Sequence, residues 1–304
     1  MIALALGLAL LGAFLMVLQR SRASFAANES LARLEDSARH ALSVLVPDIE
    51  QAGFYGFTDY AAATVTGRLP AGANDCGNGF AENLGAPVQG SDNAFALGSD
   101  ARDCAPTASA GGARSGSDTL TVRHASPDTV AAHAGRVQVY SQALAALGPL
   151  LLFADGHAPG PIDAAHVVRD LEVRSYYIAN NSVGRARWPA LRVKALTEAS
   201  GAAQFRDEEV LPGVEDLQVE FVVARTDAGS MRTRYVSPGV TLASEDRIVA
   251  VRLWLRIRAD ATESGFHDET SMRYANAIFT PSQAEARQRR MLIERTVALR
   301  NVPP

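Results

Sequence analysis

The chain has 304 residues, of which 47% are hydrophobic and 20% are charged, and its formal net charge is -4. This slightly acidic balance gives no global electrostatic reason to bind nucleic acid, so nucleic acid is not an expected partner. The length allows a long helix and either one large domain or two small ones.

The first stretch is the apolar run MIALALGLALLGAFLMVLQ, which carries no charge before Arg20. It provides about 18 apolar positions, near the lower limit for crossing a bilayer. From Ser24 the pattern becomes amphipathic, with apolar residues at three- and four-residue steps. One helix is therefore expected to begin in the membrane and to end at Gly53, as a rod of roughly 78 Å. Pro47 is expected to kink it or to end its regular part near Val46.

The two halves of this helix have different expected contacts. The membrane half presents the leucines Leu4, Leu8, Leu11, Leu15 and Leu18. The water-exposed half is expected to bury Leu31, Leu34, Leu42 and Leu45 against strand faces. A cleaved secretory signal and a simple single-span anchor remain alternatives. Arg20 and Arg22 favour a cytoplasmic C-terminal side, whereas the cysteines favour export, and these two signals conflict.

The only two cysteines, Cys76 and Cys104, lie in a stretch rich in Gly, Ala, Asn, Asp and Ser. A disulfide between them would stabilise the fold by roughly 3 to 4 kcal/mol on the loop-entropy model. We favour this bridge over two unrelated buried thiols, on condition that the compartment is oxidising. A metal site is not expected, because two cysteines without a nearby His cluster supply too few ligands.

Residues 60–117 show no sustained hydrophobic period and are expected to form a long loop or several short elements. After residue 117 the period changes to two, which predicts strands. The expected strands are 119–123, 136–140, 150–154, 170–179, 191–195, 206–211, 214–224, 247–259 and 290–301. In the strand 170–179, Leu171, Val173, Ser175 and Tyr177 are expected to share one face. Ser282 and Glu285 have the spacing of a capping box, which predicts a short helix over 282–290.

The two clearest strands, 214–224 and 247–259, alternate apolar with polar residues. This pattern is typical of antiparallel strands with one buried and one wet face. The acidic outer face of the first is expected to pair with the basic outer face of the second. The whole pattern predicts an α+β protein with a helix (1–53), a loop-rich region with the cysteine pair (54–118) and a β-rich domain (119–304).

Signals for catalysis are absent from the sequence. The six histidines are dispersed, and there is no HExxH, GxSxG, GxxxxGK[ST] or GxGxxG motif in a suitable context. We therefore expect no catalytic residue, no cofactor, no metal and no small-molecule substrate.

Several landmarks together resemble a known family. MIALALGLALLGAFLMVL is similar to the start of a mature pilin helix, and residues 30–57 resemble the PilW family of type IV pilus minor pilins, whose first helix ends before an AGF segment. Gly53 and Phe54 belong to that segment here. GVEDLQVEF (213–221) resembles the family's middle strand, and TVALRN (296–301), with Leu299, Arg300 and Asn301, its last strand.

The resemblance implies a pilin-like fold, with a long N-terminal helix packed on a mostly antiparallel sheet. It implies a non-enzymatic subunit that sits near the pilus tip and helps to start assembly, with other minor pilins, the major pilin and a tip adhesin as partners. Twitching motility, attachment and DNA uptake would be functions of the fibre. The subunit would be held in the inner membrane with its globular part in the periplasm, and would then enter the extracellular pilus.

One feature departs from the family pattern. Pilin precursors carry a basic leader that ends in Gly, and their mature helix carries a Glu five residues from its start. Neither feature is present around Met1. Processing and methylation of the N-terminus are therefore expectations that depend on a leader. The alternatives are a J-like pseudopilin of type II secretion and a membrane-anchored periplasmic enzyme or binding module.

Overall fold

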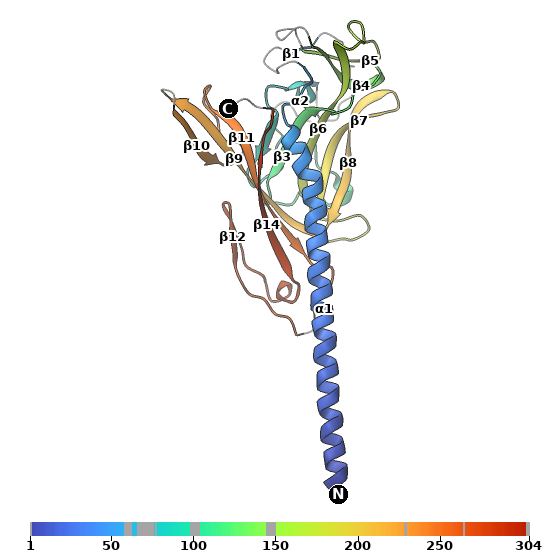
Figure 1. Ribbon diagram of the computed structural model, residues 1–304, viewed down its shortest axis with the longest axis vertical. Coiled ribbons are helices and arrows are strands. Elements are labelled where there is room, and N and C mark those ends of the chain that lie inside the picture. Colours follow the sequence, from blue (N-terminus) through green and yellow to red (C-terminus); the bar gives the residue numbers. More distant parts are fainter. Residues whose placement is uncertain are drawn as a thin grey trace.

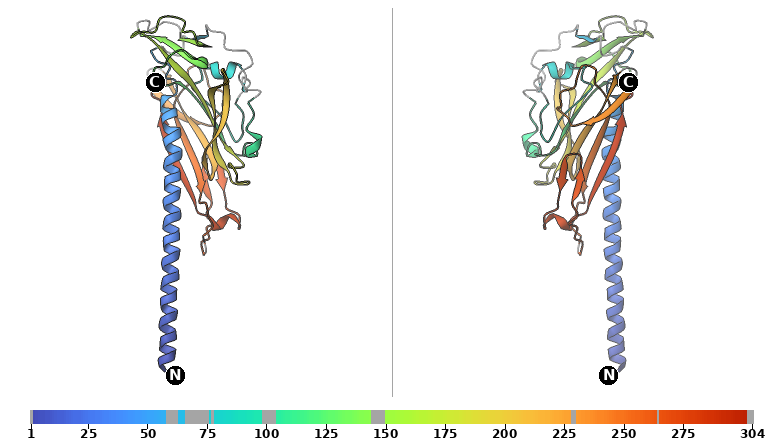
Figure 2. Two further views of the ribbon diagram at one scale, coloured as in Figure 1. Left: turned by 90° about the vertical axis from the view of Figure 1, so that its right-hand side faces the viewer. Right: turned by 90° about the vertical axis from the view of Figure 1, so that its left-hand side faces the viewer.

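The computed structural model describes residues 2–57, 63–65, 76, 78–97, 104–143, 150–227, 230–263 and 265–301. One helix, α1 (Ile2–Gln51), runs along a β-rich globular part and projects beyond it as a free rod (Figures 1 and 2). The last described residue, Asn301, lies at the upper end of α1, where its side chain binds the carbonyls of Glu50 and Gln51. The expected α+β class, with a long N-terminal helix and antiparallel sheets, is confirmed.

Helix α1 continues without interruption through Pro47 to Gln51, so the expected end near Val46 is wrong. A proline inside a helix costs roughly 3 kcal/mol, because it removes one hydrogen bond and crowds the preceding turn. Burial on both sides of Pro47 offsets this cost, since Leu45 and Ile49 are fully buried. The chain then leaves the helix through Gly53, whose φ of 81° is favourable only for glycine.

The water-exposed half of α1 lies between two sheets. Leu34 and Leu45 are buried in the main core, together with residues of both sheets, and Leu42 is partly buried against it. Leu31 is 40% exposed, so its expected burial is wrong. It lies on the part of α1 that has not yet reached the core, because burial of the leucines begins only at Leu34.

The larger sheet has eight strands, and all of its pairs except β1–β5 are antiparallel. Its path is β1-β5-β4-β6-β3-β2, and β7 joins β6 to β8. The strands are β1 (Ala63–Val65), β2 (Val88–Ser91), β3 (Thr119–Ala125), β4 (Ala134–Gln142), β5 (Leu150–Asp155), β6 (His166–Ala179), β7 (Ala190–Ala199) and β8 (Ala202–Pro212).

The smaller sheet has the order β10-β9-β11-β14. Its strands are β9 (Val214–Asp227), β10 (Ser230–Val236), β11 (Arg247–Arg258) and β14 (Arg290–Ala298). A separate hairpin joins β12 (Met272–Tyr274) to β13 (Ala277–Phe279). The short helices are α2 (Asn78–Glu82) and the 3-10 turns η3 (Ala108–Ala110) and η4 (Glu285–Arg287).

Every strand expected after residue 117 is present, with longer bounds in most cases. The sequence did not indicate β10, because SMRTRYV shows no apolar alternation and its side chains are largely exposed. It becomes a strand through pairing with β9. The segment 54–118 contributes β1, α2 and β2, and both strands join the larger sheet. Residues 58–62, 66–75, 77 and 98–103 of that segment lie outside the described residues.

Both faces of the larger sheet are covered around the end of β6. Tyr176 and Ile178 face the core that contains α1. Leu171 and Val173, at odd positions, face a second core that contains the cysteines, and Tyr177 lies in a smaller cluster on that side. This double burial explains why residues 175–179 are buried without alternation in an antiparallel strand.

The outer face of the smaller sheet is wet only in part, which corrects the sequence-based expectation. Asp216 and Gln218 on β9 and Arg256 on β11 are buried, whereas Glu220 and Arg252 stay partly exposed. The hairpin β12–β13 covers Asp216 and Arg256, since Tyr274 donates a hydrogen bond to Asp216 at 2.6 Å and Phe279 stacks on Arg256. The expected pairing of acidic and basic residues across the strands is confirmed, with Arg252–Glu220 at 3.7 Å and Arg256–Asp216 at 3.6 Å.

The expected helix over 282–290 is reduced to the single turn η4. Glu285 still accepts a hydrogen bond from the backbone N–H of Ser282 at 2.9 Å, which is one half of the capping box. The helix does not continue because Arg290 already belongs to β14 and binds the buried carboxylate of Glu215, with Nε–Oε2 at 2.8 Å.

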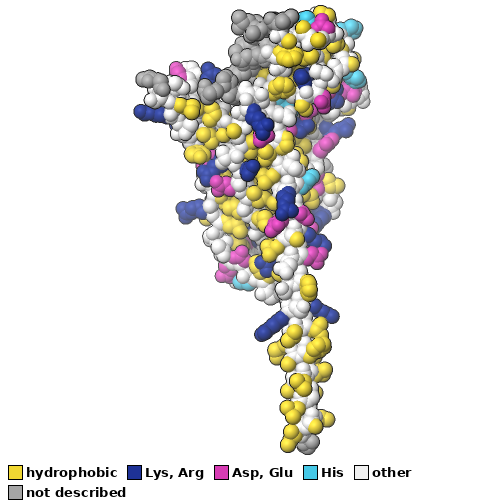
Figure 3. All heavy atoms as spheres, in the orientation of Figure 1, with side chains coloured by type: hydrophobic (Ala, Val, Ile, Leu, Met, Phe, Trp, Pro, Cys, Tyr) yellow, Lys and Arg dark blue, Asp and Glu magenta, His cyan; other side chains and the backbone are white. Residues whose placement is uncertain are grey.

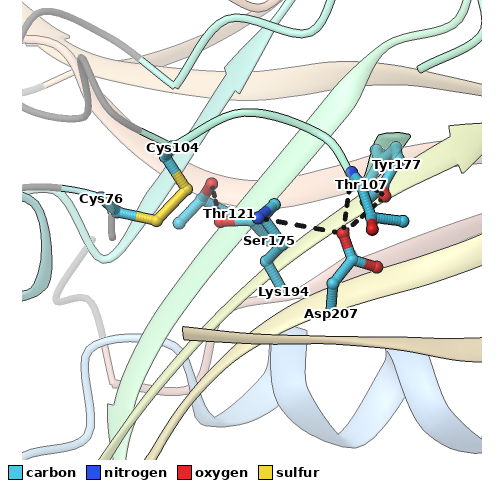
Figure 4. Close-up of a disulfide and its surroundings, with 8 residues drawn as sticks. All are labelled: Cys76, Cys104, Thr107, Thr121, Ser175, Tyr177, Lys194 and Asp207. Atoms are coloured by element: carbon cyan, nitrogen blue, oxygen red, sulfur yellow. Dashed lines mark hydrogen bonds and ion pairs between the residues drawn. A yellow bond between two sulfur atoms is a disulfide. The ribbon is translucent and has the colours of Figure 1, made fainter. Parts of the chain in front are cut away.

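Cys76 and Cys104 form a disulfide, as favoured from the sequence, and both are buried. The bridge lies over the side of the larger sheet that carries Thr121 and Ser175 (Figure 4). It ties the chain before α2 to the chain that precedes η3. Next to it, Tyr177 donates a hydrogen bond to Asp207 at 2.7 Å.

We expect Leu45→Ala to lower the free energy of unfolding by about 2–5 kcal/mol, because it opens a cavity where α1 meets both sheets. Leu31→Ala, on the same helix but exposed, is the matched control and should change it by less than about 0.5 kcal/mol. Urea unfolding of the full chain in detergent micelles measures both. Equal effects of the two substitutions would contradict the packing described.

Replacing Cys76 and Cys104 together by alanine should lower the free energy of unfolding by about 3–4 kcal/mol, because the closed loop no longer restricts the unfolded chain. The same unfolding measurement is repeated with and without reductant. Reductant should destabilise the parent chain and leave the double variant unchanged. If reductant leaves the free energy of unfolding of the parent chain unchanged, the bridge is contradicted.

Candidate functional site: the exposed helix and its attachment to the sheets

The free half of α1 is apolar and unburied. It is the one helix in the described residues that is long and apolar enough to cross a membrane, with a mean hydropathy of 2.4 and none of that window buried. Figure 3 shows hydrophobic side chains along the visible face of the projecting rod, with Lys or Arg side chains where it approaches the globular part. An apolar surface of this size requires a lipid or protein partner.

The five leucines predicted for this half lie on the projecting rod. Leu4, Leu8, Leu11, Leu15 and Leu18 are between 36% and 72% exposed. They succeed one another at alternating steps of four and three residues, which places them on one face of the helix. We refer to them below as the leucine ridge.

The other half of α1 is attached to the larger sheet by a buried charge cluster. Asp48, on α1, is 5% exposed. Its Oδ1 lies 2.6 Å from Nη1 of Arg174 on β6, and its Oδ2 accepts a hydrogen bond from Tyr176 on the same strand. Nε2 of the buried His124, on β3, lies 3.7 Å from Oδ1. These four residues form what we call the Asp48 clasp.

The neighbours of Asp48 keep it ionised. Burial raises the pKa of the Asp48 carboxyl, but the contacts with His124, Arg174 and Tyr176 lower this pKa by a larger amount. The pKa of Asp48 is therefore below its ordinary value. His124 is held by Nδ1, which lies 2.9 Å from the carbonyl oxygen of Ala125 and must donate to it. The Asp48 carboxylate therefore joins α1 to β6 and lies beside His124 of β3.

Sequence reasoning missed the clasp. Asp48 was not singled out, because periodicity does not distinguish a buried acid from a solvated one. The available signal was its position between Leu45 and Ile49, which are both on the buried face. An acid on an apolar helical face needs a cationic partner, and Arg174 in the strand 170–179 supplies it.

The segment after α1 docks on the edge of β3. Gly53 donates its backbone N–H to the carbonyl of Arg123 at 3.0 Å, and the carbonyl of Phe54 accepts from Ala125 at 2.6 Å. The Phe54 ring lies 5.3 Å from the guanidinium of Arg169. Gly53 and Phe54, two of the residues on which the family resemblance rests, therefore fix the exit of the helix.

The C-terminal residues of the resemblance meet the same helix end. Leu299 is buried and donates its N–H to Val249 at 2.9 Å. Arg300 lies 2.8 Å from the Glu50 carboxylate. Asn301 donates its side-chain amide to the carbonyls of Glu50 and Gln51, each at 3.3 Å. Carbonyls at a helix C-terminus lack intrahelical partners, so these residues cap α1.

The described part of the chain contains no group of three His, Cys, Asp or Glu residues arranged to hold a metal ion. Several of its buried carboxylates are paired with arginine side chains. Glu215, for example, accepts from Arg256 at 3.1 Å and from Arg290 at 2.8 Å. What the arrangement offers is an exposed apolar helix rigidly joined to a folded domain.

Similarity to known proteins covers part of this chain. Residues 175–301 match the model of the PilW family, described as type IV pilus-assembly protein W, and this part of the chain contains β7 to β14 and both C-terminal landmarks. No curated protein matches the sequence. Among solved structures, the chain is similar to a type IV-like pilin from Thermus thermophilus, with 13% identity, 88% of this chain and 97% of that chain covered, and a TM-score of 0.36.

Acidification should weaken the attachment of α1. The folded-state pKa of Asp48 is lowered, so its stabilising contribution is complete above the unfolded pKa of about 4 and is lost as the pH falls through the folded pKa. Asp48→Asn should lower the free energy of unfolding by about 3 kcal/mol at pH 7, because it breaks the buried charged contacts to Arg174 and Tyr176 and leaves Arg174 with Glu172 as its remaining counterion. It should also flatten the dependence of stability on pH below about 4.

The matched control is Glu50→Gln, two residues further along α1, where the ion pair with Arg300 is largely exposed. It should cost less than about 1 kcal/mol. Unfolding curves between pH 3 and pH 7 measure both variants. An Asp48→Asn chain that keeps the acid sensitivity of the parent would show that another group carries it.

Proposed function

We propose, because residues 175–301 match the PilW family, that this chain is a minor pilin: a non-enzymatic subunit of the type IV pilus that helps to start assembly near the tip. The observation that carries the proposal is the free apolar half of α1, joined to a globular domain by the Asp48 clasp. A segment of this kind can be held by lipid before assembly and by neighbouring helices in a fibre.

The physical basis is the equivalence of two apolar environments. In a bilayer the backbone of a spanning helix satisfies its own hydrogen bonds, and its side chains contact acyl chains. In a fibre, the apolar side chains of other helices replace the lipid without exposing the leucine ridge to water. The subunit would therefore wait in the inner membrane with its domain in the periplasm, and then move into the fibre.

The attachment of α1 to the domain fits this role. The main core, the Asp48 clasp and the cap by Arg300 and Asn301 hold the upper half of the helix at three places. A domain that is joined so firmly moves together with its helix when the helix is lifted out of the membrane. The partners we propose are other minor pilins, the major pilin and a tip adhesin.

The test is recovery of the full-length chain from sheared surface fibres, with mass spectrometry of its N-terminus. We expect the chain in the fibres with a processed, methylated end. Leu11→Asp, near the middle of the apolar run, should abolish its presence there, because a charge at that depth costs about 2.5–3.5 kcal/mol. Val183→Asp, at an exposed position of the globular domain, is the control and should leave it unchanged.

An unprocessed chain found only in membranes would remove the pilin proposal. It would bring forward the alternative of an anchored periplasmic enzyme or binding module.

A further inference from the structure

Strand β10 forms a free edge of the smaller sheet. Its one partner strand in the described part of the chain is β9, whereas β14, at the opposite edge, lies beside α1 (Figure 1). The residues from Ser230 to Tyr235 are all exposed, and Met231 and Tyr235 are 59% and 57% exposed. An uncovered strand edge can pair with another extended chain.

The outward main-chain groups of β10 belong to three residues. Two residues connect β9 to β10, so the closing pair Asp227–Ser230 is a hydrogen-bonded pair. Hydrogen-bonded and non-bonded pairs alternate along an antiparallel ladder. The N–H and C=O groups of Met231, Thr233 and Tyr235 therefore point away from β9. No backbone hydrogen bond from elsewhere in the described residues engages them.

The side chains of these three residues share the outer face of the smaller sheet. The Tyr235 ring lies 5.3 Å from the guanidinium of Arg252, which also lies 4.6 Å from the ring of Trp254. The hairpin β12–β13 covers Asp216 and Arg256 further along the sheet. A strand added beside β10 would extend this partly apolar face, so apolar or β-branched side chains suit that side of it.

Two arginines of β10 disfavour pairing with a second copy of the chain. A two-fold dimer would pair the two β10 edges antiparallel. When the pairing is centred on Thr233, Arg232 of each copy faces Arg234 of the other. The two neighbouring registers place Arg232 opposite Arg232 or Arg234 opposite Arg234. Like charges directly opposite each other destabilise a strand pair, and charged edges commonly prevent self-association.

The acids around this edge leave Arg232 without a counterion. These acids are Asp227, Glu245 and Asp246. Asp246 binds Arg225 at 2.8 Å and Arg234 at 2.5 Å. Asp227 and Glu245 also interact electrostatically with Arg225. Arg232 lies directly opposite Arg225 on β9 and forms no ion pair with any described residue. An acidic side chain on an added strand would therefore pair with Arg232.

We propose that β10 is a docking edge for an extended segment of a different protein, which pairs with it as an added strand and places an acidic side chain opposite Arg232. Main-chain hydrogen bonds to Met231, Thr233 and Tyr235 would supply affinity, and alternating acidic and β-branched side chains would supply specificity. The docking edge lies on the opposite side of the smaller sheet from β14, so it is separate from the helix contacts of the proposed function.

The test uses the full chain in detergent micelles and two short peptides, in which valine alternates with glutamate or with lysine. Residue-resolved amide hydrogen exchange shows where a peptide lies. The glutamate peptide should slow exchange at Met231, Thr233 and Tyr235, whose N–H groups point outward. The amides of Arg232 and Arg234 already bond to β9, so they are the internal control and should change little.

Titration of the same exchange signals compares the two peptides. The glutamate peptide should bind at least about tenfold more tightly than the lysine peptide, because it replaces repulsion at Arg232 by attraction. Arg232→Glu, at an exposed position, should reverse this preference. Arg206→Glu, an equal charge change on the edge strand β8 of the larger sheet, is the matched control and should leave the preference unchanged.

A backbone substitution tests the pairing itself. Thr233→Pro removes one outward N–H and leaves the hydrogen bonds between β10 and β9 in place, and proline is tolerated on edge strands. Binding of the glutamate peptide should be lost. If this variant does not fold, the charge reversal by Arg232→Glu still decides the outcome.

Slower exchange at the three outward amides, with a preference that Arg232→Glu reverses, supports the docking edge. Equal binding of both peptides overturns the acidic partner, and unchanged exchange with either peptide overturns the docking edge. Slower exchange that depends on protein concentration without peptide would place a second copy there and would also overturn it. The fibre experiment tests the proposed function separately from all of these outcomes.

Discussion

The structure depends on one constraint: a single helix must be stable in two different surroundings. Its lower half exposes leucine on all sides, and its upper half buries leucine between two sheets. The change occurs within a few turns, between Leu18 and Leu34. In the upper half, burial of apolar side chains is supplemented by the Asp48 clasp and by the cap at Glu50 and Gln51. The helix and the domain are consequently one body.

Buried carboxylates organise both sheets in a similar way. Asp48 collects Arg174, Tyr176 and His124 from two strands of the larger sheet. Glu215 collects Arg256 and Arg290 from two strands of the smaller one. A buried ion pair contributes little net stability, but loss of one partner leaves an unpaired charge and is costly. Such clusters therefore determine which helices and strands lie together more than they add to the stability of the fold.

The same helix links the attachment to the outer surface of the molecule. Arg22, Ala26, Glu29 and Arg33 follow the leucine ridge at steps of three or four residues and therefore continue the same face of α1. At the end of β11, Arg258 reaches the buried Glu215 at 3.6 Å, donates to the carbonyl of Arg187 at 3.1 Å and stacks on Trp188.

Sequence by itself determined the elements that follow from periodicity. The long helix, the strands after residue 117, the shared face of Leu171 and Val173, and the α+β class all follow from spacings of two or of three and four residues. The disulfide followed from cysteine count and composition. Asn301 was marked only by family resemblance, and the structure supplies its physical role as a cap of α1.

Tertiary structure alone decided which polar residues are buried. Arg256 and Asp216 have the pattern of a wet face, yet a hairpin from residues 272–279, distant in sequence, covers them. Pro47 has the character of a helix end, yet packing on both sides carries the helix through it. Local pattern reports only how residues alternate along the chain. What covers a face, and which distant charge meets an acid such as Asp48, depends on elements that become neighbours only in the folded molecule.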